Sequence, residues 1–202
     1  MAQITSVDDL RALYGAPGER SARKQLARLD RHARTIIGLS PFCLLATSGA
    51  DGLGDVTPRG DGPGFVAVMD DVTIALPDRP GNNRLDSLLN ILERPGVGLL
   101  FLVPGIDETL RVNGSAEIRT DNELLARFPV GGKLPKSVLL IRVREVYLHC
   151  AKALMRSRLW DPAVQVDRDV LPSMGQMLKD QLDLPHGESQ DEMLERYRAT
   201  MY

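Results

Sequence analysis

The sequence has few aromatic residues, only two cysteines and almost no excess of charge of either sign. Aromatic side chains make up 4% of its 202 residues, which argues against a surface on which nucleic-acid bases stack. The formal net charge is −2, so the chain has no general attraction to nucleic acid or to an anionic membrane. These shortages argue against nucleic-acid partners.

A long apolar run is also missing. No window approaches the ~18 consecutive apolar residues that indicate a transmembrane helix. The start of the chain, MAQITSVDDLRALYG, carries acidic side chains and no apolar stretch, so no signal peptide is predicted. We therefore expect a cytoplasmic location and no membrane partner.

The two cysteines, Cys43 and Cys150, are both expected to be buried thiols, because each lies in or directly after an apolar run. A disulfide is not expected in a cytoplasmic chain. His149 and Cys150 are adjacent, but no second pair of metal-ligating residues stands at a ligand spacing. The sequence therefore predicts no metal site.

The familiar catalytic motifs do not occur. There is no GxGxxG after a strand, no Walker loop, and no Ser/His/Asp constellation with a recognisable local motif. What is present is enough apolar residue, 43% of the chain, to build a core for one domain with helical additions. Catalytic side chains remain unassigned at this point.

Two helical segments open the chain. Residues 6–14 have helical periodicity, with Ser6 as a candidate N-cap. Residues 19–37 place apolar side chains at helical spacing and carry arginines and lysines on the other side. That basic side is open to two interpretations, contact with RNA or an ordinary solvated surface, and the solvated surface is the simpler one.

Short apolar runs bounded by glycine, proline and aspartate dominate the middle of the chain and indicate strands. They fall at 42–48, 55–59, 65–69, 72–76, 97–103, 109–119 and 137–150. Short helices are expected at 121–128, 151–157 and 172–183, with a further turn or two in the charged tail 186–202.

Three of these strands carry finer information. Pro58 cannot donate to a sheet ladder, so strand 55–59 should lie at an edge or contain a bulge. The run 97–103 is apolar throughout and is expected to be buried on both faces. In 109–119 apolar and polar residues alternate, and Gly114 indicates a bulge or the close approach of another backbone or a ligand.

Short connections between the strands favour antiparallel pairing, and a closed or split barrel manages the edges of such a sheet. The sequence thus predicts a mainly β protein with flanking helices, of the α+β class. We expect a helical lead-in at 1–40, a barrel domain at 41–150, and a helical extension at 151–202 that packs on the barrel or on a partner subunit.

The stretch RPGNNRLDSLLNI, residues 79–91, follows a strand and enters a helix. Asn83 is the expected N-cap, with Asp86 three residues later at the spacing of a capping box. The helix is expected to bury one face, formed by the leucines at helical spacing: Leu85, Leu88, Leu89 and Leu92.

The start of this helix is dense in hydrogen-bond donors. Free backbone N–H groups and the positive end of a helix dipole suit an anion, most often a phosphate. The residues alone support two interpretations equally, a phosphate site or a capped helix with solvated arginines. The side chains concerned are Arg79, Asn82, Asn83, Arg84 and Ser87.

Taken together, four segments resemble the FMN-binding split-barrel family related to pyridoxamine 5'-phosphate oxidase. They are residues 43–61, 75–91, 97–103 and 110–118. The resemblance spans about residues 30–160, and the motif SRLWDP at 157–162 is similar to a bacterial subgroup of FMN-dependent enzymes. It implies an antiparallel split β-barrel that binds FMN as a homodimer.

The resemblance also implies which residues meet the cofactor. It implies that the second strand contacts the flavin ring and the phosphate, and that the turn holds the phosphate. A C-terminal segment would reach the flavin that is bound mainly by the partner subunit. The residues are Val56, Thr57 and Arg59 on the second strand; Arg79, Asn82, Asn83, Arg84 and Ser87 at the turn; Arg111 near the dimer interface; and Arg158 and Trp160 in the C-terminal segment.

The activity implied by the resemblance is that of an FMN-dependent oxidoreductase acting on an unidentified small molecule. The flavin would supply the redox chemistry, which agrees with the lack of a catalytic triad. Two alternatives on the same fold stay open: a flavin- or haem-binding protein without turnover, and a reductase that uses deazaflavin F420. The chain ends in ERYRATMY rather than in the basic segment that grips the oxidase's substrate, so pyridoxamine phosphate is not the expected substrate.

Overall fold

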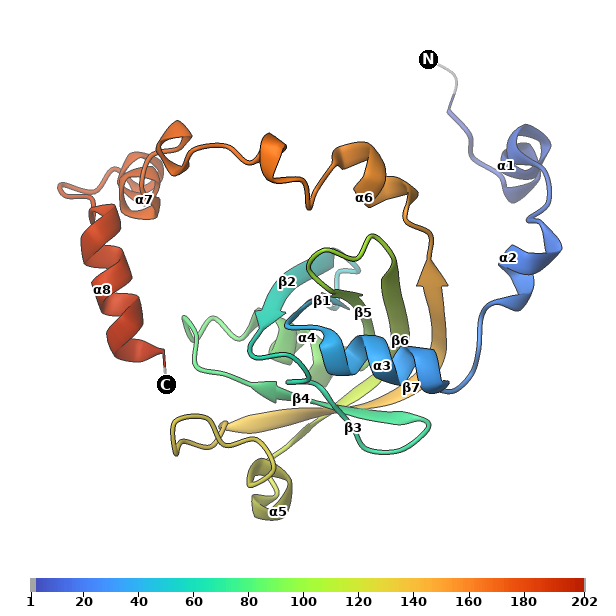
Figure 1. Cartoon of the computed structure of the whole chain (residues 1–202), viewed down its shortest axis with the longest axis horizontal. Helices are drawn as coiled ribbons and strands as arrows, with labels where there is room; N and C mark the ends of the chain where they lie inside the picture. Colours follow the sequence, from blue (N-terminus) through green and yellow to red (C-terminus); the bar gives the residue numbers. More distant parts are fainter. Residues whose placement is uncertain (1–2, 202) are drawn as a thin grey trace.

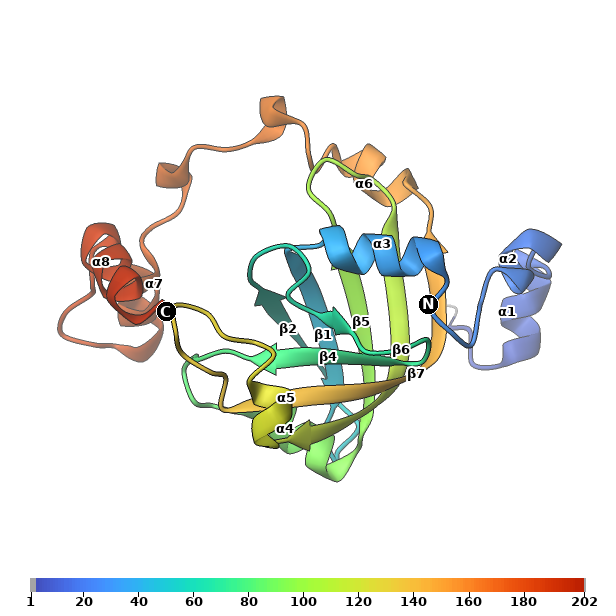
Figure 2. The same cartoon turned by 60° about the horizontal axis from the view of Figure 1, so that its bottom comes forward.

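The computed structural model describes residues 3–201, and its strands form one antiparallel sheet that curls into a barrel (Figures 1 and 2). The strand order in the sheet is β2-β1-β5-β6-β7-β4-β3. The strands are β1 (Phe42–Ser48), β2 (Gly54–Gly60), β3 (Ala67–Val68), β4 (Thr73–Asp78), β5 (Gly96–Leu102), β6 (Thr109–Arg119) and β7 (Ser137–His149). The predicted antiparallel α+β fold is confirmed.

Helices flank this sheet and precede and follow it. They are α1 (Val7–Tyr14), α2 (Glu19–Arg23), α3 (Arg31–Leu39), α4 (Asp86–Glu93), α5 (Asn122–Leu125), α6 (Lys152–Ser157), α7 (Met174–Leu182) and α8 (Gln190–Thr200), with 3₁₀ turns η1 (Pro162–Val164) and η2 (Arg168–Val170). Among residues 3–201, no helix combines the length and apolar character needed to cross a bilayer. The division into three parts at residues 40 and 150 stays a prediction.

Alternation along the strands builds the core. In β1, Cys43 and Leu45 are fully buried, whereas their neighbours are only half-buried. The same alternation holds in β5, where Leu99 and Phe101 are buried while Leu100 on the other face is half-buried. The prediction that this strand is buried on both faces is therefore wrong, because nothing in residues 3–201 fully covers the outer face of the barrel there.

The edge strand and the bulge follow the sequence prediction. β2, which contains Pro58, forms one edge of the sheet. The register between β6 and β7 shifts at Asn113 and Gly114, which marks the predicted bulge. A Cβ on Gly114 would lie 2.2 Å from the backbone oxygen of Arg142, so only glycine allows β7 to approach this closely.

The single helix expected at 19–37 is instead two helices, α2 and α3, joined by an extended link. Within the link, Leu26 exchanges backbone hydrogen bonds of 2.9 Å in both directions with Val146 of β7. Asp30 then caps α3 by accepting a 2.8 Å bond from the N–H of Ala33. Pairing with the sheet satisfies the backbone of the link better than an isolated helix in solvent would.

The helix predicted after residue 79 begins at Asp86, so Asn83 is not its N-cap. Asn83 and Leu85 both adopt the left-handed conformation, with φ of 58° and 62°. The helix turns Ser87 and Ile91 inward, and Leu88 packs beside them. The predicted leucine face is therefore wrong for Leu85, Leu89 and Leu92, which are 49%, 53% and 72% exposed.

The two cysteines differ in environment. Cys43 is fully buried, and this burial raises the pKa of its thiol to about 12, although the charge of Arg59 acts in the opposite direction. Cys150 is exposed, so the prediction that it is buried is wrong. The reason is its position directly after β7, where the chain leaves the sheet for α6.

Candidate functional site

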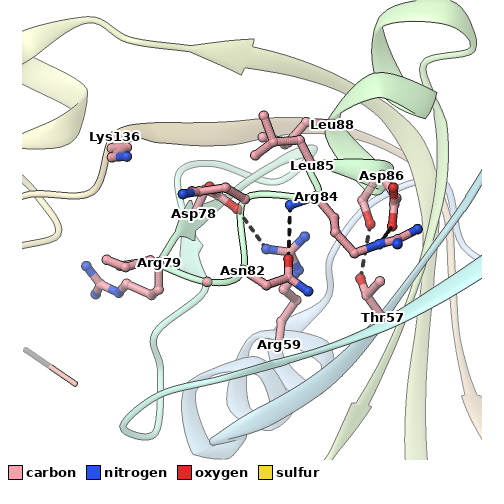
Figure 3. Close-up of a pocket in the computed structure, with 14 residues that line it drawn as sticks. Thr57, Arg59, Asp78, Arg79, Asn82, Arg84, Leu85, Asp86, Leu88 and Lys136 are labelled. Carbon is pink, nitrogen blue, oxygen red and sulfur yellow. Dashed lines mark hydrogen bonds and ion pairs between the residues drawn. The ribbon is translucent and has the colours of Figure 1, made fainter. Parts of the chain in front are cut away.

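A cavity of about 390 Å³ lies between β2, the β4–α4 connection and the start of α4 (Figure 3). The loop that precedes β7 completes its wall with Lys136. Seven of the residues that the sequence suggested for cofactor binding line it: Thr57, Arg59, Arg79, Asn82, Asn83, Arg84 and Ser87. Segments far apart in the sequence therefore converge on one hollow.

The register of β2 decides which of its side chains reach the cavity. Thr57 and Arg59 lie opposite the inward residues Leu45 and Cys43 of β1, so they face the side that α4 covers. Val56 faces the other side and is 59% exposed. The hydroxyls of Thr57 and Ser87 lie 3.1 Å apart and connect β2 to the first turn of α4.

Arg59 is the arginine held most firmly at the wall of the cavity. Its Nη1 donates to Asp78 Oδ1 at 2.7 Å, and both side chains are at most 20% exposed. Its Nε is buried and has no hydrogen-bond partner in the described part of the chain. A buried donor without a partner costs about 1–3 kcal/mol.

Arg79 borders the same cavity but directs its guanidinium elsewhere. Its Nε donates to Asp61 at 2.8 Å, and its Nη1 donates to the backbone oxygen of Phe128 at 2.8 Å. In Figure 3 this guanidinium points away from Arg59. Arg79 therefore anchors the turn to neighbouring loops and adds positive charge to the wall from behind.

Arg84 lies at the rim. Its Nε donates to Asp86 at 2.8 Å, and this hydrogen bond and charge raise the pKa of the guanidinium above its usual value. Its backbone N–H donates to the side-chain oxygen of Asn82 at 3.0 Å, which holds the turn before α4. With 72% of its side chain exposed, Arg84 is the most accessible of the three arginines.

Sequence reasoning missed Asp78, Asp86 and Lys136 as members of this wall. The two carboxylates each hold an arginine in place, whereas Lys136 is exposed and makes no ion pair among the described residues. Four cationic and two anionic side chains line the cavity, an excess of positive charge that suits an anion. Lys136 stands more than 40 residues from the turn, so no local pattern could have identified it.

Four suggested residues lie outside the cavity in this chain. Val56 faces the opposite side of β2, and Arg111 stacks its guanidinium 4.1 Å above the ring of Tyr147. Arg158 pairs with Asp161, and the indole of Trp160 donates to the backbone oxygen of Ile106 at 3.0 Å. Their contact with a flavin held by a partner subunit stays a prediction.

The split barrel and its positively charged cavity define an α+β protein with a site that suits an anion. The sequence model described as pyridoxamine 5'-phosphate oxidase matches residues 29–150, more than half of the chain. The chain therefore belongs to the pyridoxamine 5'-phosphate oxidase family, as the resemblance implied.

The chain was also compared with solved structures. A variant of HupZ from Group A Streptococcus is 18% identical, with a TM-score of 0.50 over 59% of this chain and 98% of the other. A Lactobacillus delbrueckii protein described by reference to pyridoxamine 5'-phosphate oxidase is 22% identical, with a TM-score of 0.47 over 61% and 98%. An F420 reductase is 20% identical, with a TM-score of 0.42 over 60% and 98%. No curated protein matches the chain.

Proposed function

We propose that the cavity holds the phosphate of FMN and that the chain is an FMN-dependent oxidoreductase acting on a small molecule. The observation that carries this proposal is the excess of cationic side chains around one cavity, where Arg59 lies beside the hydroxyls of Thr57 and Ser87. A phosphate dianion needs several charge-assisted hydrogen bonds, each contributing about 1.5–3 kcal/mol. Arg59, Arg84 and Lys136 can supply them from three sides of the cavity.

The cavity is large enough for more than a phosphate. Its volume of about 390 Å³ falls within the range of ordinary small-molecule sites, roughly 300–1,000 Å³. When bound, the flavin would supply the redox chemistry, and the chain would fix its position and exclude water. No acid, base or nucleophile on the protein is required, which agrees with the absence of a recognisable catalytic motif.

We propose that two copies form the active unit. Val56 on β2 and Leu89 and Leu92 on α4 are exposed apolar side chains on two elements that border the cavity. A second copy that packs on these elements would remove such side chains from water. Such a partner would also bring Arg158 and Trp160 of its own chain toward the flavin, the role that family resemblance gives them.

The absorbance spectrum of the purified protein tests the cofactor, and mass spectrometry of the released ligand identifies it. FMN is the expected ligand, whereas F420 would redirect the proposal to a deazaflavin reductase. A protein that is colourless and takes up no added FMN contradicts the proposal. Reduction of the bound flavin by NAD(P)H and its reoxidation by an acceptor would separate an oxidoreductase from a flavin-binding protein without turnover.

A further inference from the structure

The C-terminal helices α7 and α8 form a fixed hairpin. A Cβ on Gly175 would lie 2.2 Å from the backbone oxygen of Glu188, so the two segments touch where glycine allows it. Ser173 Oγ donates to the same oxygen at 2.9 Å, and the guanidinium of Arg196 pairs with the Glu188 carboxylate at 2.7 Å. The hairpin is thus a folded unit with a defined surface.

This hairpin exposes a large share of its apolar side chains. Those between 37% and 62% exposed are Met174, Leu178, Leu182, Leu184, Leu194, Tyr197 and Met201. Helix α1, at the other end of the chain, exposes its apolar residues in the same way, by 44% to 76%: Val7, Leu10, Leu13 and Tyr14. Short amphipathic helices depend on tertiary packing for their stability, so both sets need a cover.

One chain cannot cover both sets by folding on itself. Both views place α1 and α2 on one side of the barrel and α7 and α8 on the opposite side (Figures 1 and 2). An extended stretch with the turns η1 and η2 carries the chain to the hairpin. The bond from Trp160 to Ile106 ties the beginning of this stretch to the β5–β6 connection.

The two ends of the chain also carry opposite charge. Residues 15–34 contain six basic and two acidic side chains, a net charge of +4. Residues 162–201 contain eight acidic and four basic side chains, a net charge of −4. A shallow hollow of about 440 Å³ lies in the basic part, lined by Glu19, Arg20, Arg23 and Lys24. Charge and apolar exposure are therefore complementary between the two ends.

We propose that the α7–α8 hairpin of one copy docks on α1 and the basic segment 15–34 of a second copy, and reciprocally. A two-fold axis makes the two contacts equivalent and closes the assembly at two chains. Each contact joins an apolar set to an apolar set, and it joins the hairpin residues 173–201, with a net charge of −3, to residues 7–34, with a net charge of +3. The inference rests on the homodimer proposed above and adds the surfaces that hold it.

The test places fluorescent labels on the full-length chain in a Cys150→Ser background, where the buried Cys43 does not react. One population carries a donor at Ser21→Cys in the basic segment, and another an acceptor at Ala199→Cys on α8. Mixing them should produce energy transfer between copies, together with twice the 22.2 kDa mass of one chain. A particle of the double mass without transfer overturns the docking and leaves the homodimer intact, whereas a monomer overturns both.

Charge exchange sharpens the same measurement. Replacing three bases by glutamate should change the net charge of the basic segment from +4 to −2. The affinity between two copies, measured by energy transfer, should then fall at least tenfold. Replacing three acids by lysine in the same chain should change the charge of residues 162–201 from −4 to +2 and restore transfer. The substitutions are Arg20→Glu, Arg23→Glu and Arg28→Glu, with Asp169→Lys, Asp180→Lys and Glu195→Lys.

Glu123→Lys on α5 is the matched control, because it alters a charge outside both ends and should leave transfer unchanged. Transfer that ignores the triple reversal contradicts the charge complementarity. None of the altered residues lines the cavity, so FMN absorbance gives an independent readout. If the protein binds no FMN but energy transfer is retained, the proposal that FMN is the cofactor is wrong and the docking proposal stands.

Discussion

Arg59 and Arg84 both line the cavity, but their surroundings predict that they contribute differently to the free energy of phosphate binding. Arg59 is at most 20% exposed and keeps one buried donor without a partner among residues 3–201, whereas Arg84 is 72% exposed and paired with Asp86. A hydrogen bond to a charged group is stronger where water is excluded, and exposed ion pairs contribute about 0–1 kcal/mol. The phosphate grip should therefore depend mainly on the buried arginine.

Arg59→Ala should weaken FMN binding by about 10- to 150-fold, since one charge-assisted bond of about 1.5–3 kcal/mol is lost. Arg84→Ala should weaken it less, by up to roughly fivefold. Fluorescence titration of FMN measures both, and Arg59→Lys shows how much is due to charge alone. Equal effects of the two alanine variants would place the phosphate at the rim instead.

The thiols should differ in reactivity. In the native protein a thiol reagent should modify Cys150, which is exposed, and should modify Cys43 only after unfolding. Counting released chromophore with and without denaturant measures this, and Cys150→Ser supplies the control. Rapid modification of Cys43 in the Cys150→Ser variant would mean that the core opens locally.

Cys43 also predicts a dependence of stability on alkaline pH. Its folded pKa, raised to about 12, lies above the ordinary thiol value of 9.0, so the unfolded chain loses the proton first. Its contribution is therefore complete below pH 9 and is lost as the pH rises toward 12, with a slope of at most about 1.4 kcal/mol per pH unit. Chemical denaturation at several pH values should show this fall, and Cys43→Ala should flatten it.

At the scale of elements, the β6–β7 pair depends on one glycine. Gly114→Ala would place a methyl group 2.2 Å from the backbone oxygen of Arg142, so the strands must separate at the bulge. We expect a loss of roughly 2–4 kcal/mol in the free energy of unfolding, measured by urea titration. Gly96→Ala on β5 is the control, because open space surrounds that position; similar losses at both would contradict the steric explanation.

The strands could be predicted from the sequence because their signals are local. Alternation identified β6, Pro58 marked β2 as an edge, and Gly114 marked the bulge, and the structure bears out all three. Each depends on backbone geometry that the residue itself dictates. For this reason these elements needed no knowledge of the rest of the chain.

Helix α4 shows where the local argument fails. Four leucines at helical spacing and a plausible cap at Asn83 predicted its start and its buried face. The turn instead places Leu85 in the left-handed conformation, which costs an ordinary residue about 1–2 kcal/mol, and so delays the helix and rotates it. The turn lies at the cavity, where backbone strain of this kind tends to be found.

The residues of the candidate site also fall into a group that the sequence could predict and a group that it could not. Its arginines and asparagines lie together in the sequence and could be grouped from it. Asp78 and Asp86 also lie in or beside that stretch, whereas Lys136 joins the site only through the register of β4 with β7, which places Asp78 opposite Ser137. Long-range pairing of this kind leaves no pattern in a single sequence.

At the scale of the whole molecule, two copies that associate as proposed should stabilise each other. The melting temperature should then rise with protein concentration, by roughly 5–10 °C for a hundredfold increase, because only the folded chain associates. Differential scanning fluorimetry over a hundredfold range of protein concentration would measure the rise. The charge-reversed chain should show a smaller rise, and a constant melting temperature would contradict self-association.

The two edges of the sheet limit how such copies can meet. β2 ends the ladder on one side with Pro58, which has no N–H to offer, and β3 ends it on the other with only two residues. A further strand finds no long row of free backbone groups at either border. Chains brought to high concentration should therefore resist templated growth into fibres, even though many of their leucines face the solvent.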